Sequence, residues 1–307
     1  MTGSPLAATG SLVTGSLDTS GWFPSRYGAD DAAGALNEIT PAKRVAAMQL
    51  VREGRLFDLA HVLHDAVPAF PGRTFRQWMH ERAPDGGLGT NHVHWVAERF
   101  EATTQMGTHV DGLNHLHVGN RTYNGHAVDA IVTETGTTRL GIETMPQIVT
   151  RGLLIDIAAR RGIDHLPAGA VVTPDEVEAA LADDGLTVTP GDAVLFHTGW
   201  GRLWDDDPAR YPTGQPGPGR ALGAWLADHR VALTGCDTWS YGPVPAEDPD
   251  EPFVVPQILN VRNGVVVMEN LRLGDLAAAG VHEFALVVSH PKLLGATGAW
   301  VAPLALV

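Results

Sequence analysis

Short apolar runs and stretches of helical period alternate along most of this chain. A run of roughly four to eight apolar residues predicts a buried strand. Such runs cover residues 56–63, 151–158, 193–197, 231–235, 265–268, 283–289 and 300–307. Between them, apolar residues recur with helical spacing in 41–54, 174–182, 221–229 and 275–279. This alternation of strands with short helices predicts the α/β class.

Two of the predicted helices carry start signals. Thr40 is a good cap, and Pro41 after it suits the first helical position. Thr173 and Glu176 form the pattern of a capping box, in which each side chain bonds the other's backbone N–H. The first helix is expected to bury an apolar stripe of Val45, Met48 and Val51.

Other stretches lack such periodicity. Residues 1–20 are rich in Gly, Ser, Thr and Ala, and we predict a mobile N-terminal tail there. Residues 21–307 contain no repeat and no linker, which predicts a single domain. Residues 68–89 are expected to be irregular because glycine and proline turns interrupt them, while 91–96 is expected to be a strand.

Composition and charge exclude several classes of partner. The 307 residues carry a formal charge of -14, which argues against nucleic acid and against anionic membrane surfaces. No apolar run approaches the length of about 20 residues that spans a membrane, and no signal-peptide pattern opens the chain. Cys236 is the only cysteine and sits in an apolar run, so it is expected to be buried. We expect a cytoplasmic protein.

Candidate chemistry is concentrated in the stretch from Gln105 to His115. His109 and Asp111 are two positions apart, so in an extended segment their side chains share a face. Gly107 and the β-branched Thr108 disfavour a helix here. An imidazole and a carboxylate on one face suit a divalent metal of the zinc or manganese type.

The same stretch resembles the signature of the metal-dependent cyclase-like hydrolases, which reads His-x-Gly-Thr-His-x-Asp-x-x-x-His. Residues 107–111 and His115 match it, and Gln105 stands where the first histidine is usual. Further family motifs follow in order at 122–125, 191–195, 198–200, 262–264, 269–271 and 295–298. The family includes bacterial kynurenine formamidase, isatin hydrolase and a trans-dienelactone hydrolase. The resemblance covers most of the chain from about Phe57 onward.

The resemblance implies roles for individual residues. His109 and Asp111 become metal ligands, Gln105 is the third ligand by position, and His115 inherits the role of general acid and base. Thr108 is a plausible donor to the oxyanion. Members with two metals add a glutamate, matched by Glu269, and a histidine. Pro256 or Gln257 replaces that histidine, so we expect one Mn or Zn ion rather than two.

The resemblance also implies a fold and a reaction. The fold is the swivelling β/β/α arrangement, a mixed sheet with flanking helices, in a homodimer or homotetramer. The reaction is hydrolysis of an amide, lactam or lactone in a small cyclic or acylated compound by metal-activated water. Eight tryptophans suit an aromatic or flat substrate. The residues expected to contact substrate or to support the ligands are Glu269, Trp200, Tyr123, His94 and Gln257.

Two other interpretations remain open from the sequence. His92 and His94 form a His-x-His pair on a predicted strand, which is also how cupin-type metal enzymes bind their ion. That interpretation predicts that removing His92 releases the metal and that removing His109 does not. Alternatively, the departures at Gln105 and Gln257 mark a degenerate member that binds or assembles without catalysis.

Overall fold

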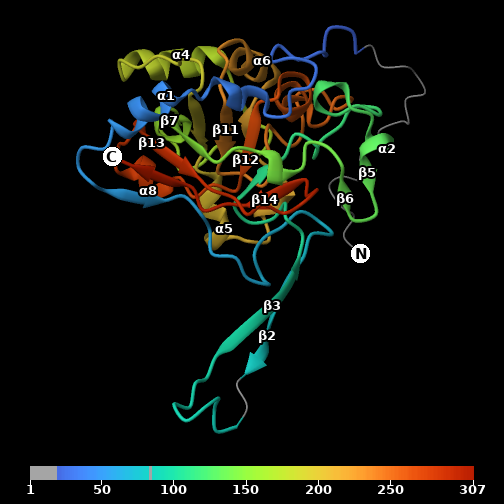
Figure 1. Ribbon diagram of the computed structural model, residues 1–307. Helices are drawn as coiled ribbons and strands as arrows, with labels where there is room; N and C mark the ends of the chain where they lie inside the picture. Colours follow the sequence, from blue (N-terminus) through green and yellow to red (C-terminus); the bar gives the residue numbers. More distant parts are fainter. Residues whose placement is uncertain (1–18, 83–84) are drawn as a thin grey trace.

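One large mixed sheet forms the centre of the molecule, as the computed structural model shows (Figure 1). The structure describes residues 19–82 and 85–307. The sheet has nine strands in the order β1-β15-β13-β7-β9-β11-β12-β4-β14. These strands are β1 Leu56–Asp58, β4 His109–Asp111, β7 Ile148–Asp156, β9 Ala193–His197, β11 Leu233–Cys236, β12 Val266–Glu269, β13 Glu283–Val288, β14 Gly298–Trp300 and β15 Leu304–Leu306.

Shorter elements surround this sheet. Three two-stranded sheets pair β2 Phe75–Arg82 with β3 Val96–Ala102, β5 Val132–Thr133 with β6 Gly136–Thr137, and β8 Val171–Val172 with β10 Gly217–Pro218. The helices are α1 Pro41–Met48, α2 Val128–Ile131, α3 Ile157–Arg160, α4 Pro174–Asp183, α5 Leu203–Asp206, α6 Arg220–Asp228, α7 Val254–Pro256 and α8 Gly274–Ala278. The mixed sheet and its flanking helices confirm the predicted fold class.

The centre of the large sheet is parallel, and its edges are antiparallel. Strands β7, β9, β11 and β12 run in parallel, whereas β13, β15, β4 and β14 pair in antiparallel fashion. Along β7, Leu153 and Ile155 pack into one apolar cluster, and Leu154 packs into the other. Helices α4 and α6 cover the first face through residues such as Val177 and Leu222. Parallel strands buried on both faces explain the continuous apolar runs in the sequence.

The helix start signals are confirmed, but the stripe on α1 is not. Thr40 accepts a hydrogen bond from the backbone of Lys43, and the capping box of α4 has both of its bonds. The helix α1 ends at Met48, and among its residues only Ala47 is buried. Val45 and Met48 face solvent because the helix meets the sheet only along a narrow line around Ala47.

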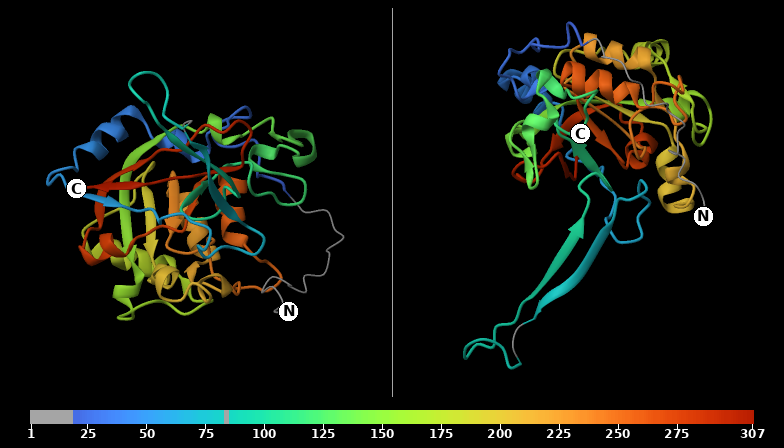
Figure 2. Two further views of the ribbon diagram at one scale, coloured as in Figure 1. Left: turned by 90° about the horizontal axis from the view of Figure 1, so that it is seen from below. Right: turned by 90° about the vertical axis from the view of Figure 1, so that its right-hand side faces the viewer.

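The most prominent departure from the sequence predictions is a hairpin that extends away from the body (Figures 1 and 2). Its strands are β2 and β3, although β2 falls in the stretch predicted to be irregular. The apolar pattern of a buried strand is missing because solvent reaches both faces of this ribbon. We call residues 75–102 the arm.

The predicted strand at 91–96 is wrong, because the chain turns at the tip of the arm. His92 has a left-handed backbone with φ of 52°, and its Nδ1 lies 2.8 Å from the carbonyl oxygen of Gly86. His94 follows in irregular backbone. The cupin-type interpretation needs a His-x-His pair on a strand of the core, and the structure overturns it.

Of three further predictions, one falls almost wholly outside the described residues, one strand is shorter than predicted, and one prediction is confirmed. The predicted N-terminal tail lies almost wholly outside the described residues. Strand β1 ends at Asp58, short of the predicted residue 63. Cys236 is fully buried, as predicted. Within residues 19–82 and 85–307, no helix has the length and apolar character needed to cross a membrane.

Candidate metal centre

Strand β4 lies next to the edge of the large sheet and carries two of the predicted ligands, His109 and Asp111. It pairs antiparallel with β12 on one side and with β14 on the other. In this register Glu269 lies directly opposite His109, and Gly298 lies opposite Asp111. Residues directly opposite each other in antiparallel strands place their side chains on the same face. The pairing therefore adds the carboxylate of Glu269 to the imidazole and carboxylate of β4.

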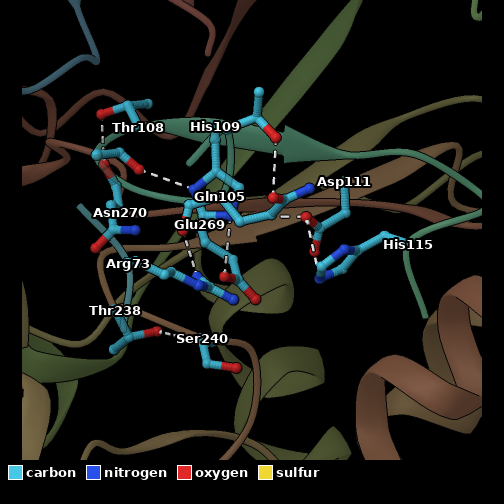
Figure 3. A network of polar contacts seen from close by, with 12 residues as sticks. Arg73, Gln105, Thr108, His109, Asp111, His115, Thr238, Ser240, Glu269 and Asn270 are labelled. Atoms are coloured by element: carbon cyan, nitrogen blue, oxygen red, sulfur yellow. Dashed lines mark hydrogen bonds and ion pairs between the residues drawn. The ribbon is translucent and has the colours of Figure 1, made fainter. Parts of the chain in front are cut away.

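These three side chains converge on one point (Figure 3). His109 Nε2 lies 3.2 Å from Glu269 Oε2 and 3.6 Å from Asp111 Oδ1. One ligand atom from each of the three residues lies within 4.8 Å of the other two. His109 is fully buried, and the two carboxylates are almost as buried. Their spacing suits one ion bound to all three.

The hydrogen bonds around His109 leave its ligating nitrogen available. Its Nδ1 lies 2.8 Å from the carbonyl oxygen of Gly107, so Nδ1 carries a proton and Nε2 points to the carboxylates. Within the described part of the chain, neither His109 Nε2 nor Asp111 Oδ1 has a hydrogen-bond partner. Buried polar atoms without partners are unusual and are typical of a site that binds an ion or a ligand.

The electrostatics of this group also favour a cation. Burial by itself lowers the pKa of His109, but the contact with Glu269 and the charge of Asp111 outweigh burial and raise that pKa. Two carboxylates in a buried position create a negative potential, and a divalent cation would neutralise it. The three side chains therefore fit a metal ion by both geometry and charge.

His115 stands beside the three convergent residues rather than among them. Its Nε2 lies 3.9 Å from Asp111 Oδ1, and its side chain remains 27% exposed. Both residues line one cavity of about 160 Å³. His115 therefore faces the space in which a bound molecule would lie next to His109, Asp111 and Glu269.

The cavity has an apolar wall and a few polar groups. Its apolar wall includes Phe70, Trp239 and Phe253. The other lining residues are Arg73, Asp111, His115, Leu116, Ser240, Pro256, Asn260, Val267 and Glu269. A volume near 150 Å³ is enough for a molecule the size of benzene. The cavity thus suits a single small ring that is held next to the convergent side chains.

Gln105 is buried near this group, but its amide is already engaged. Its Oε1 accepts a hydrogen bond from Thr104 Oγ1, and its Nε2 donates one to Thr297 Oγ1, each at 2.9 Å. Its backbone carbonyl accepts a hydrogen bond from Arg73. Gln105 thereby ties β14 and the base of the arm to the start of β4. Glu269, rather than Gln105, completes the convergent set.

Four residues that were expected at the substrate lie away from the cavity. Thr108 Oγ1 donates to the carbonyl oxygen of Asn270 at 2.6 Å and accepts from the backbone of His61, so the hydroxyl joins two loops. Trp200 is buried and donates its indole N–H to the backbone of Tyr211. Gln257 Nε2 donates to the carbonyl oxygen of Pro252. His94 belongs to the tip of the arm.

Tyr123 is also structural rather than a contact for substrate. It is fully buried, and its hydroxyl donates to Asp31 Oδ2 at 2.7 Å. The neighbouring Asn124 donates to the backbone oxygens of Gly28 and Ala29. The loop that contains these two residues therefore anchors the segment before α1.

Three polar residues of the cavity, Arg73, Ser240 and Asn260, were missed by the sequence analysis. Arg73 lies before β2, and its guanidinium stacks over Phe70 at 5.2 Å. Asn260 lies in a π-helical turn over Gln257–Arg262, a rare conformation that is often found at functional sites. Its Nδ2 donates to Gly112, whereas its buried Oδ1 has no hydrogen-bond partner among the described residues. The sequence signals near this turn were the departure at Pro256 and Gln257 and the family motif at 262–264, and neither points to Asn260.

A second polar cluster occupies the ends of β7, β9 and β11. His197 Nδ1 lies 2.8 Å from Asp156 Oδ1, and its Nε2 lies 3.9 Å from Asp237 Oδ2. Burial lowers the pKa of His197, but Asp156 and Asp237 raise it overall. His197 and Asp237 line a separate cavity, of about 140 Å³, with His61. None of the expected ligands lies in this cavity.

Comparisons with known proteins match these observations. The family described as putative cyclase matches residues 57–243. The crystal structure of a novel cyclase is 29% identical, with a TM-score of 0.81 over 92% of this chain and 98% of that one. Isatin hydrolase A from Ralstonia solanacearum is 22% identical, with a TM-score of 0.61 over 87% of this chain and 97% of the other. A search of the curated proteins found no match.

A third structure extends this likeness. It is described as a predicted metal-dependent hydrolase from Bacillus stearothermophilus and is 18% identical, with a TM-score of 0.53. The match covers 83% of this chain and 98% of that one. At this level of identity the isatin hydrolase and the Bacillus protein are evidence for the fold alone.

Proposed function

Because the chain belongs to the putative cyclase family, we propose that it is a metal-dependent hydrolase of small cyclic or acylated amides, lactams or lactones. One observation supports this proposal above all others. His109, Asp111 and Glu269 place three ligand atoms within 4.8 Å of one another, and the two carboxylates line a cavity. Similar folds occur in proteins described as isatin hydrolases, one of them bound to the product analogue thioisatinate.

His109, Asp111 and Glu269 would hold one Mn²⁺ or Zn²⁺ ion. Imidazole and carboxylate are ligands that both ions accept. Such an ion supplies Lewis acidity, which makes water a nucleophile near neutral pH. The hydrogen bond to the carbonyl oxygen of Gly107 orients the ring of His109 so that Nε2 points toward the two carboxylates, where it would be available to the ion.

His115 is placed to move the proton in hydrolysis. The oxygen of water adds to the carbonyl carbon, and the C–N or C–O bond to the leaving group then breaks. The imidazole of His115 takes the proton from water and returns it to the leaving nitrogen or oxygen. Its partial exposure lets it exchange protons with solvent, and Asp111 stands 3.9 Å from its Nε2.

The other residues of the cavity suit a flat ring with one polar edge. Phe70 and Trp239 offer aromatic surface to the ring. Arg73 is a cationic donor that can bind the carbonyl oxygen as it gains charge, the role first assigned to Thr108. The free Oδ1 of Asn260 can accept a hydrogen bond from the N–H of a cyclic amide. A lactam can therefore form one more hydrogen bond with the lining residues than a lactone can, because a lactone has no N–H.

Metal analysis joined to an activity assay tests this function. The purified protein is loaded with Mn²⁺ or Zn²⁺, dialysed and analysed for bound metal, beside His109→Ala and the control Gln257→Ala. Each is then assayed with a panel of aromatic lactams and lactones. We expect about one ion per chain and ring opening for the native protein and the control, and neither for His109→Ala. Native protein that binds no metal and hydrolyses nothing would identify a non-catalytic member of the family.

A further inference from the structure

Asn270 directly follows Glu269, and the structure holds it in an uncommon conformation. Its backbone is left-handed, with φ of 54°, and the residue is almost completely buried. Most residues with a side chain are strained in this region of backbone space, and asparagine is one of the few that adopt it readily. Strand β12 therefore ends in a change of direction, one position after a proposed metal ligand.

Three separate segments of the chain hold Asn270 by its polar groups. Its backbone N–H donates to the carbonyl oxygen of Thr238 at 2.8 Å. Its carbonyl oxygen accepts a hydrogen bond from Thr108 Oγ1 at 2.6 Å (Figure 3). Its side-chain Oδ1 accepts one from the hydroxyl of Tyr211 at 2.9 Å. Asn270 therefore cannot change its backbone conformation without breaking hydrogen bonds between buried groups, which is costly.

The hydrogen bond from Thr108 connects the two strands that carry the proposed ligands. Thr108 directly precedes His109 at the start of β4, just as Asn270 directly follows Glu269 at the end of β12. The backbone pairing between these strands comprises two residue pairs, and the pair of His109 with Glu269 is the last. The hydroxyl of Thr108 thus extends the connection between the strands by one position, where the turn at Asn270 ends regular pairing.

Aromatic side chains support this network of hydrogen bonds. The ring of Tyr211 meets Trp204 edge-on at 5.5 Å, and the ring of His61 stacks on Trp204 at 4.2 Å. The backbone N–H of His61 donates to Thr108 Oγ1 at 2.9 Å. The contacts therefore form a closed circuit that runs from Thr108 through Asn270, Tyr211, Trp204 and His61 back to Thr108.

We propose that Asn270 is a positioning residue for the metal centre, and that Thr108 and Tyr211 act through it. This inference rests on the proposed metal-dependent function. The imidazole and the carboxylates come from different strands, so they converge only while β4 and β12 keep their register. The two hydroxyls fix the backbone of Asn270, and they thereby fix the direction in which the carboxylate of Glu269 leaves β12.

The surroundings of the two hydroxyls favour this role over contact with a substrate. Thr108 Oγ1 has both an acceptor and a donor partner within the protein, and Thr108 does not line the cavity beside Glu269. Tyr211 is fully buried and also lies outside that lining. An effect of either hydroxyl on metal binding therefore passes through the ligands that it positions.

Substitutions that remove single hydroxyls test the inference. Thr108→Val removes the hydroxyl and nearly keeps the shape of the side chain, whereas Thr108→Ser keeps the hydroxyl. Tyr211→Phe removes the second donor. Competition with a chelator measures the affinity of each purified protein for Mn²⁺ or Zn²⁺. We expect Thr108→Val and Tyr211→Phe to bind the metal about 10- to 100-fold more weakly, and Thr108→Ser to bind it like the native protein.

Thr150→Val is the matched control. Thr150 is fully buried on β7, three strands away from β12, and its hydroxyl donates to the backbone carbonyl of Gly191. We expect Thr150→Val to lose stability in urea unfolding, as Thr108→Val does, but to keep the native affinity for the metal. The comparison separates the positioning of ligands from the loss of a buried hydrogen bond.

Bound Co²⁺ gives a second measurement that a purely structural role would not change. Sites with imidazole and carboxylate ligands also accept Co²⁺, and its visible absorption depends on the number and geometry of its ligands. In protein saturated with Co²⁺, Thr108→Val and Tyr211→Phe should alter this spectrum. Thr150→Val and Thr108→Ser should retain the native spectrum.

The outcomes distinguish the inference from the function on which it rests. Native metal affinity in Thr108→Val or in Tyr211→Phe would overturn the inference and leave the proposed metal site intact. An equal loss of affinity in Thr150→Val would also overturn it, because general destabilisation would then explain both results. Native protein that binds no metal would refute the proposed function, and the inference with it.

Discussion

Glu269 lies directly opposite His109 where β12 pairs with β4, and its Oε2 stands 3.2 Å from His109 Nε2. The carboxylate comes from a part of the chain 160 residues away from the imidazole. The sheet therefore assembles the candidate site, and the register between two short strands decides its geometry. A shift of one residue in this register would turn Glu269 to the opposite face.

Replacing Glu269 by Gln should weaken metal binding. The substitution keeps the volume of the side chain but removes one of the negative charges that would hold the cation. Removing a residue that only positions a metal ligand through a hydrogen bond weakens metal affinity about 10- to 100-fold. Glu269 is proposed to bind the metal directly, so we expect its replacement to weaken metal affinity at least as much. Competition with a chelator of known affinity measures it. Affinity equal to that of the native protein would exclude Glu269 as a ligand.

Gln105→Ala should affect stability rather than metal content. The amide of Gln105 bonds Thr104 and Thr297, and the side chain is buried. Removing it leaves the half-buried hydroxyl of Thr297 without its donor, and we expect the lost hydrogen bond to cost about 1 kcal/mol. Urea unfolding measures the loss, and metal analysis of the same sample shows whether the ion is kept. Metal loss as large as that of Glu269→Gln would restore Gln105 as a ligand.

The part of the site that the sequence predicted is the part that local geometry determines. The alternation of a strand suffices to place His109 and Asp111 on one face. Arg73 and Asn260 could not be found in this way. Arg73 reaches the cavity because the base of the arm folds against β4, and Asn260 because the chain adopts a π-helical turn.

The same reasoning explains which elements of the fold were predicted. Strands such as β7 and β9 lie in the core and carry the unbroken apolar runs that burial on both faces requires. The arm has no such run, because solvent reaches both faces of its two strands. Tyr123 was expected to contact substrate or support the ligands, and nothing in the local sequence indicates that its hydroxyl meets Asp31.

His115→Gln should separate catalysis from metal binding. Glutamine fills similar space but cannot take up and return a proton, so kcat should fall about 10²- to 10⁴-fold. Bound metal should remain close to one ion per chain, because His115 lies outside the convergent set. Steady-state kinetics and metal analysis on the same preparation measure the two effects. His117→Gln is a matched control, since His117 is an exposed neighbour that does not line the cavity. A large loss of metal in His115→Gln would make this residue a ligand rather than an acid and base.

His61→Phe should flatten the dependence of stability on pH in mild acid. Burial lowers the pKa of His61 to about 4, and its ring stacks on Trp204 at 4.2 Å. Above the unfolded value of about 6.5, His61 is neutral in both states and contributes no pH dependence. As the pH falls from about 6.5 to about 4, the unfolded chain binds a proton that the folded chain excludes, so stability is lost.

The difference between the two pKa values corresponds to about 3 kcal/mol at most. Phenylalanine keeps the stack on Trp204 and removes the titration. Urea unfolding at about pH 7.5 and at about pH 4.5 should therefore show a smaller loss of stability on acidification for His61→Phe than for the native protein. His92→Phe removes an exposed histidine at the tip of the arm and is the control. It should lose as much stability between the two pH values as the native protein does. Equal losses in His61→Phe and the native protein would show that His61 titrates normally in the folded state, and that its buried ring is open to water.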